Sequence, residues 1–353
     1  MPRPAPVRLL TALLAACLAA TCTPAESEPG AFPHARPHVR AVTLDAREAP
    51  AAGTLERLHA LGVTHLTLVT FGFQPGLSAP EIRFSPDVRW YSESAPGIRT
   101  LARQADSLGI GLIMKPQLWI GRDAWSADIA FASEADWLAW EAQYHAFAMH
   151  AAHLARDVGA DVLVVGTELG GPVRERPGFW RRLVADVRAV YDGRLTYAAN
   201  WHDDYETVPF WDVLDYVGVQ AYFPLSRTTD PSPEALRRGW QPVRARLEAA
   251  ARRARRPVLF TEIGYRSVPY AAAEPWRWPS RDEHGAVAPD PALQARLYEA
   301  FFESVWNAPW FAGAIVWKWY PEAPTSRRLP RDLDFTPQDK PAEAVIREWF
   351  TKD

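Results

Sequence analysis

Eight short apolar runs recur along the chain, and stretches with helical periodicity separate most of them. Several of the runs do not alternate between apolar and polar residues, as in Val162-Leu163-Val164-Val165. Continuous apolar runs are typical of parallel strands that are covered on both faces. A series of such strand–helix units favours one closed (β/α)8 TIM barrel over a doubly wound open sheet. The predicted strands are 41–46, 65–73, 111–120, 162–169, 195–201, 216–225, 258–265 and 312–320.

The stretches between and after the strands predict helices that cover the barrel from outside. The segment 207–214, after the fifth strand, is too short for a full helix. Two long loops, 74–96 and 266–290, each follow a strand, so both should lie at the mouth where this fold builds its active sites. The predicted helices are 51–61, 97–108, 134–158, 178–191, 234–254, 291–307 and 341–350.

The composition is that of a globular protein and excludes some functions. Hydrophobic residues make up 48% and charged residues 23%, which excludes a largely disordered chain. The net charge of −3 does not favour a surface for nucleic acid, so we expect no nucleic-acid partner. The 16 tryptophans require a large core or a stacking surface for flat apolar ligand faces, and sugar rings have such faces.

The beginning of the chain resembles a targeting segment. Arg3 and Arg8 precede an apolar run at 9–16, which is too short to span a bilayer and has the proportions of a signal peptide. Leu14-Ala15-Ala16-Cys17 resembles the bacterial lipobox, in which the cysteine is acylated and becomes the mature N-terminus. A plain secretory signal, or acylation at Cys22, is the alternative.

We therefore expect three parts: a lipoprotein-type signal peptide at 1–16, a Pro-rich tether at 17–38 and one (β/α)8 domain at 39–353. The protein would be exported and held at the bacterial cell envelope, on its periplasmic or surface face, by a lipid on Cys17.

Two of the predicted strands end in glutamate. Glu168 closes the fourth strand and Glu262 the seventh, which places them on roughly opposite sides of the barrel mouth. Each alone could be a helix-capping carboxylate or an ion-pair partner. A pair of carboxylates flanking one bond is what glycoside hydrolysis needs, because one protonates the leaving oxygen while the other attacks or activates water.

The other strand ends carry groups suited to sugars. Amides, a lysine and a phenol can hydrogen-bond sugar hydroxyls, and indoles can pack on their C–H faces. Lys115 could instead pair with a neighbouring acid. Trp317 and Trp319 should share one face of the eighth strand, and core packing is the alternative for the indoles. The candidate substrate-binding residues are Lys115, Gln117, Trp119, Asn200, Trp201, His202, Gln220, Trp317 and Trp319.

Motifs of other chemistries are missing from the sequence. The predicted barrel domain has no His-x-x-x-His, and the sequence has no close Cys/His cluster, no Gly-x-Ser-x-Gly, no Walker loop and no Gly-x-Gly-x-x-Gly. We therefore expect neither a metal nor a cofactor.

Six motifs together resemble glycoside hydrolase family 113, the clan A β-mannanases, from about residue 41 to the C-terminus. They are VGTEL (165–169), TYAANW (196–201), FWD (210–212), DYVGVQAY (215–222), LFTEIGYRS (259–267) and PWFAG (309–313).

This resemblance implies a retaining β-1,4-mannan hydrolase that uses no metal. It implies that Glu168 is the acid/base, Glu262 the nucleophile and Tyr222 the tyrosine against the nucleophile. It makes Trp317 or Trp319 the platform under the sugar. In one departure from the clan, Thr167 stands where many members have the asparagine that binds the sugar 2-hydroxyl.

Three functions remain open at this point. The first is hydrolysis of β-1,4-mannosidic bonds in mannan or manno-oligosaccharides, with the two carboxyls about 5–5.5 Å apart as retention requires. The second is the same mechanism on another β-linked oligo- or polysaccharide, from chain ends or within chains. The third is a non-catalytic, glycan-binding surface lipoprotein.

Overall fold

The computed structural model describes residues 39–85, 88, 90–121, 124–202, 204–278, 283, 285–321 and 331–352. The predicted signal peptide (1–16), the tether (17–38) and Cys17 lie outside these residues. Within the described ranges, none of the helices combines the length and the apolar character needed to cross a membrane.

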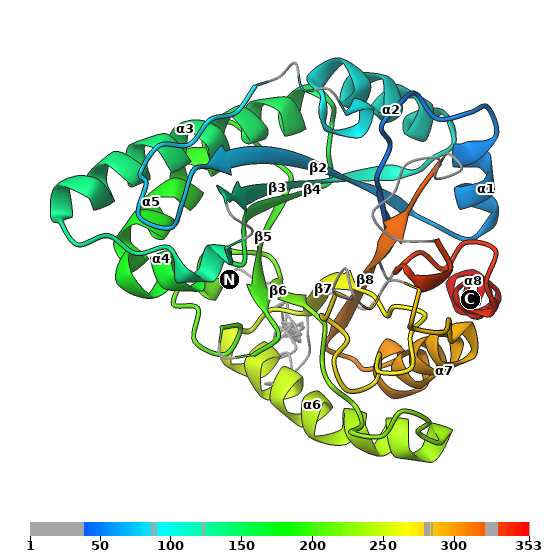
Figure 1. Ribbon diagram of the computed structural model, residues 1–353. Helices are drawn as coiled ribbons and strands as arrows, with labels where there is room; N and C mark the ends of the chain where they lie inside the picture. The colour runs from blue at the N-terminus through cyan, green and yellow to red at the C-terminus, as the bar shows by residue number, and fades with distance from the viewer. Residues whose placement is uncertain are drawn as a thin grey trace, which may run out of the picture. The chain divides into compact units, whose positions relative to one another are not determined.

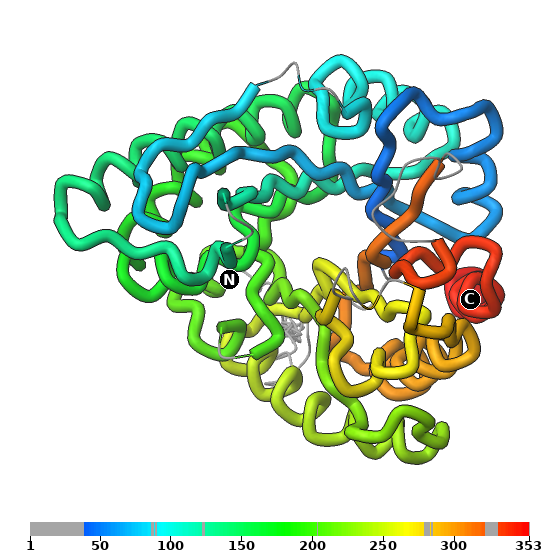
Figure 2. Tube along the Cα trace, viewed as in Figure 1, coloured from blue at the N-terminus to red at the C-terminus, as the bar shows by residue number. Residues whose placement is uncertain are grey.

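The strands form a closed parallel barrel in which each strand pairs with its neighbour in sequence and β8 pairs with β1. Figure 1 shows the strands in the middle and the helices around them, and the trace in Figure 2 follows the same path. The prediction of a (β/α)8 barrel is confirmed. The strands are β1 (Val39–Leu44), β2 (His65–Gln74), β3 (Gly111–Ile120), β4 (Val162–Thr167), β5 (Arg194–Asn200), β6 (Val217–Gln220), β7 (Val258–Ile263) and β8 (Phe311–Trp319).

The helices cover the barrel and present apolar faces to it. Four of them begin after a serine or aspartate whose side chain accepts a backbone N–H of the first turn: Ser94, Ser133, Ser232 and Asp290. The helices are α1 (Thr54–Ala60), α2 (Ala95–Ser107), α3 (Glu134–Asp157), α4 (Gly170–Glu175), α5 (Pro177–Arg188), α6 (Pro233–Ala254), α7 (Pro291–Phe301) and α8 (Pro341–Thr351).

Shorter helical turns complete the connections. They are η1 (Tyr91–Glu93), η3 (Ser126–Asp128), η4 (Trp211–Val213), the π-helical η6 (Phe302–Trp306) and η7 (Arg331–Leu333). As predicted, the segment 207–214 carries only one short turn, η4. The short helix α4 was not predicted, and β4, β6 and β7 end before the predicted strands do, because the apolar runs continue into buried loops at the mouth.

The barrel closes through a close approach between its first and last strands. Gly313 of β8 pairs with Val39 of β1. The backbone of Gly313 has φ 138°, and a Cβ there would lie 2.1 Å from the Val39 carbonyl oxygen. Glycine therefore allows both the dihedral angle and the contact that closure requires.

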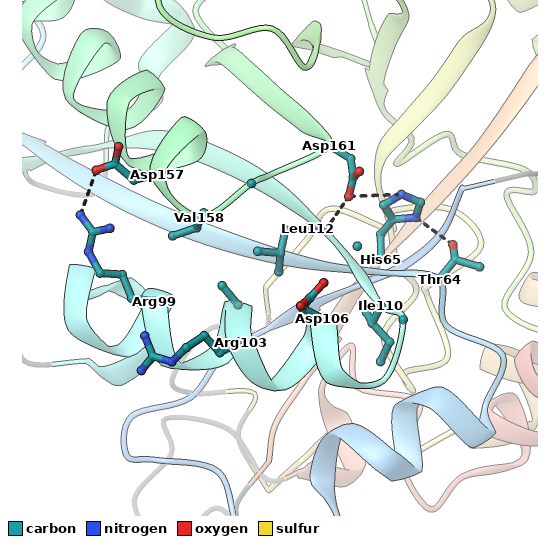
Figure 3. Close-up of a pocket in the computed structure, with 14 residues that line it drawn as sticks. Thr64, His65, Arg99, Arg103, Asp106, Ile110, Leu112, Asp157, Val158 and Asp161 are labelled. Atoms are coloured by element: carbon teal, nitrogen blue, oxygen red, sulfur yellow. Dashed lines mark hydrogen bonds and ion pairs between the residues drawn. The ribbon is translucent and has the colours of Figure 1, made fainter.

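A hollow of about 820 Å³ opens at the end of the barrel where the strands begin. Figure 3 shows its polar lining, in which Arg99 pairs with Asp157 and Asp161 accepts the Leu112 N–H at 2.9 Å. These partners are contributed by the helix ends and strand starts that meet there. The hollow is on the opposite side of the barrel from the carboxyl ends of β4 and β7, where the two glutamates lie.

Candidate active site

The two glutamates lie at the carboxyl ends of their strands, as predicted. Glu262 is the fifth residue of β7, and Glu168 directly follows β4. Glu168 has φ 52°, in the left-handed region that few non-glycine residues adopt. Two hydrogen bonds hold its backbone there: the Glu168 N–H donates to the Ala198 carbonyl oxygen, and the Glu168 carbonyl oxygen accepts from Ser126 Oγ, each at 2.9 Å.

The Glu262 carboxylate is buried, with 4% of the residue exposed, and two side chains bind it. Tyr222 donates its hydroxyl to Oε2 at 2.5 Å. The ammonium of Lys115, which is fully buried, forms an ion pair with Oε1. A buried carboxylate is stabilised as an anion by such a cation and such a donor together.

Tyr222 is suited to remain a donor. Burial raises the pKa of its phenol well above 10, and the negative charge of Glu262 raises it further. The hydroxyl therefore keeps its proton throughout the neutral pH range and directs it at the carboxylate.

Glu168 has a different environment. Burial, and then the negative charge of Glu262, raise the pKa of its carboxyl to about 7, while Lys115 acts in the opposite direction. Asn200 Nδ2 donates to Oε1 at 2.7 Å, and the Trp125 indole also hydrogen-bonds the carboxyl. One glutamate is thus paired with a cation, and the other is poised to hold a proton near neutral pH.

The residues predicted on β3 extend from this centre to the surface on one face of the strand. Lys115 also lies 3.4 Å from Gln117 Oε1, and Trp119, two residues on, is 53% exposed. Lys115 therefore has the alternative role considered from sequence, that of partner to an acid. Gln220 of β6 is buried, and its amide oxygen accepts a hydrogen bond from Thr261 at 3.0 Å.

The two indoles of β8 lie on different faces of the strand, contrary to the prediction that they share one. The Trp317 ring is 5.4 Å from the Lys115 ammonium, at the carboxylate centre. Trp319 is 1% exposed, and the guanidinium of Arg57 on α1 lies 5.1 Å over its ring. Trp319 is thus part of the core beneath α1, and Trp317 is the candidate platform.

An irregularity of the strand explains this difference. Val42 pairs with Val316, whereas Leu44 pairs with Trp319, so β8 has one residue more than β1 between these pairs. An extra residue reverses the alternation of faces beyond it. The peptide bond between Trp317 and Lys318, at this point, is cis.

The predicted aromatic residues after β5 contact two indoles that sequence reasoning did not select. Trp201 stacks on Trp276 with the ring centroids 4.9 Å apart, and His202 lies 5.4 Å from the Trp125 ring. Trp125 and Trp276 are 38% and 43% exposed. The available signal was the density of tryptophans in the loops that follow β3 and β7.

Thr167 does not replace the missing asparagine of the clan motif. It is buried, and its hydroxyl donates to the Pro116 carbonyl at 3.1 Å. Asn200 is the amide beside the Glu168 carboxyl. Among the residues that the structure describes, no group of three or more His, Cys, Asp or Glu could hold a metal ion.

A (β/α)8 barrel with two glutamates in different electrostatic environments at its mouth is an arrangement that glycosidases use. The chain belongs to Glycoside Hydrolase Family 113, whose family model matches residues 41–340. No curated protein sequence matches the chain.

Solved structures agree with this membership. The GH113 β-mannanase AaManA from Alicyclobacillus acidocaldarius, in complex with ManMIm, is 28% identical with a TM-score of 0.74, over 91% of this chain and 99% of that chain. Another GH113 β-1,4-mannanase is 23% identical with a TM-score of 0.75, over 90% and 100%. The Faecalibacterium prausnitzii β-glucuronidase is 13% identical with a TM-score of 0.58, over 89% and 48%, and shares the fold alone.

Proposed function

We propose that the protein is a retaining β-mannanase that hydrolyses β-1,4-mannosidic bonds in mannan or manno-oligosaccharides. The observation that carries the mechanism is the contrast between the two carboxyls, because Glu262 is paired with Lys115 whereas the pKa of Glu168 is raised to about 7. The choice of mannose is supported by the name of the 28% identical relative, a β-mannanase.

In the first half-reaction, the Glu262 carboxylate attacks the anomeric carbon and Glu168 gives its proton to the departing glycosidic oxygen. The bond to the leaving sugar breaks, and an ester between the sugar and Glu262 forms. In the second half-reaction, water attacks the same carbon, Glu168 accepts the proton of the water and the ester breaks. Two inversions at one carbon give net retention.

Lys115 serves both half-reactions in this scheme. At the start its positive charge balances the Glu262 carboxylate, with which it forms the buried ion pair. When the ester forms, the negative charge has moved to Glu168, and the Lys115 charge favours the ionised form of Glu168 too. The net charge of the three groups therefore stays the same from one half-reaction to the next.

Chemical rescue tests the two roles. Glu262→Ala should be nearly inactive on every substrate, and azide should restore turnover to an α-linked glycosyl azide. Glu168→Ala should still form the intermediate from an aryl glycoside whose phenol leaves without protonation. Azide should then speed the breakdown of that intermediate to a β-linked azide.

Equal losses of both variants on activated and unactivated substrates, or the opposite anomeric products, would overturn the assignment of roles. A hydrolysis panel of mannan, glucomannan, xylan and cellulose tests the sugar separately. Cleavage of xylan or cellulose in preference to mannan would contradict the mannose specificity and leave the mechanism intact.

We also propose that the protein is exported and anchored through an acylated Cys17, on the basis of the leader and lipobox-like motif. Mass spectrometry of the mature protein should find a lipidated cysteine at its N-terminus. An unmodified N-terminus further along the chain would refute lipidation but not secretion.

A further inference from the structure

Four aromatic rings form a continuous row at the mouth, which we call the aromatic row: Trp125, His202, Trp201 and Trp276. The successive ring centroids are 5.4, 4.9 and 4.9 Å apart. The rings come from segments that follow β3, β5 and β7, so three loops far apart in sequence contribute to one surface. The two end rings are exposed, and the two middle rings are half-buried.

The row begins at Glu168. Trp125 hydrogen-bonds the Glu168 carboxyl, and the residue after it, Ser126, binds the Glu168 backbone. Asn200, which donates to the same carboxyl, also accepts the His202 N–H at 3.2 Å. The row is therefore attached to the acid/base on two sides, whereas Trp317 lies beside Lys115 and Glu262.

A retaining glycosidase donates its proton to the oxygen of the leaving group, so the sugars that leave lie on the acid/base side of the cleaved bond. The exposed faces of Trp125 and Trp276 offer flat apolar surfaces there, on which the C–H faces of pyranose rings can stack. We propose that the aromatic row binds the leaving-group sugars of a β-linked oligosaccharide, with Trp276 as its outer platform. This inference rests on the proposed hydrolase function.

Trp201 has a supporting part in this site. One of its faces is covered by Trp276, at an interplanar angle of 23°, and Phe223 packs against it edge-on at 6.1 Å. It thus holds Trp276 in place, and the face of Trp276 away from Trp201 meets the sugar.

Trp276→Ala tests the proposal, and Trp278→Ala is its matched control. Trp278 comes from the same loop and is 53% exposed, but it packs on Arg266 and Phe335 outside the row. The substrates are an aryl β-mannobioside, whose leaving group is not a sugar, and mannopentaose. Trp276→Ala should lose about tenfold in kcat/KM on mannopentaose, the equivalent of one lost stacking contact, and less than twofold on the aryl substrate. Trp278→Ala should change neither rate by more than twofold.

An equal loss on both substrates would assign Trp276 to the fold or to the other side of the cleaved bond, and would overturn the proposal. An unchanged rate on mannopentaose would overturn it as well. If the wild-type protein cleaves neither mannose substrate, the proposed sugar is wrong. The same variants are then compared on an aryl β-cellobioside and cellopentaose, and on an aryl β-xylobioside and xylopentaose. A loss of rate confined to the oligosaccharide supports the aromatic row, and an equal loss on both substrates or no loss refutes it.

Discussion

Replacing Glu168 with glutamine should stabilise the folded protein above neutral pH while it removes the proposed acid/base. In the folded protein the pKa of the carboxyl is raised from 4.5 to about 7. Each pKa unit corresponds to about 1.4 kcal/mol, so enclosure in the site disfavours the ionised form by about 3 kcal/mol. Glu168 is partly accessible at the open mouth, and screening by water there reduces the expected effect to about 2 kcal/mol.

The pH range of this effect follows from the two pKa values. Below about pH 4.5 the carboxyl is protonated in both states, and Glu168 costs no stability. As the pH rises toward 7, the unfolded chain releases the proton but the folded protein retains it, so the wild-type free energy of unfolding falls. Above about pH 7 the full difference remains. Glutamine keeps an oxygen that can accept from Asn200 and never ionises.

Urea unfolding across this pH range measures the prediction. The advantage of Glu168→Gln over wild type should grow by about 2 kcal/mol between about pH 5 and about pH 8. Glu175→Gln, at an exposed position of α4, is the control and should follow the wild-type curve. If the curves of Glu168→Gln and wild type stay parallel over the whole range, Glu168 does not have the raised pKa on which its proposed role depends.

Three further outcomes are expected. The wild-type rate of hydrolysis of manno-oligosaccharides should fall as the pH rises through about 7, because Glu168 then loses its proton. An aryl substrate with a good leaving group should keep its rate over the same pH range. Identical pH profiles for the two substrates would contradict this. Lys115→Met should lower the free energy of unfolding by about 3 kcal/mol, because it leaves the Glu262 charge buried and unpaired. A loss of less than about 1 kcal/mol in urea unfolding would argue against the ion pair. Gly313→Ala should lower the free energy of unfolding by about 3 kcal/mol, because its Cβ would meet the Val39 carbonyl. Gly109→Ala should lower it by about 1 kcal/mol, because Gly109 has φ 69° but no atom within 4 Å of the added Cβ. Equal melting temperatures of the two variants would refute the closure argument.

Much of the architecture could be predicted from the sequence because parallel strands covered on both faces leave a strong local signal. The continuous apolar runs marked each strand of the barrel, and polar residues at their ends marked the mouth. Glu168 and Glu262 could be selected for this reason alone. The fold then required both to lie at one end of the barrel.

The details that the sequence did not reveal depend on contacts between distant segments. Lys115 and Glu262 are 147 residues apart in the sequence, so only the closed barrel decides whether Lys115 binds sugar or a carboxylate. The prediction that Trp319 shares a face with Trp317 was wrong because it assumed regular alternation along β8. The irregularity that breaks this alternation is visible only in the pairing with β1. Trp276 was not predicted because it lies in a loop, where no strand or helix periodicity indicates which way a side chain points.

The closure of the barrel has a consequence for the order in which the chain acquires its structure. β1 is made first but finds its second partner, β8, only after nearly all of the described chain exists, since Val39 pairs with Gly313. Until then, one edge of β1 carries unpaired backbone groups, which can pair with another chain. A growing polypeptide would therefore expose this edge until β8 is made, and shortening the chain before β8 would leave a product prone to aggregate rather than a smaller enzyme.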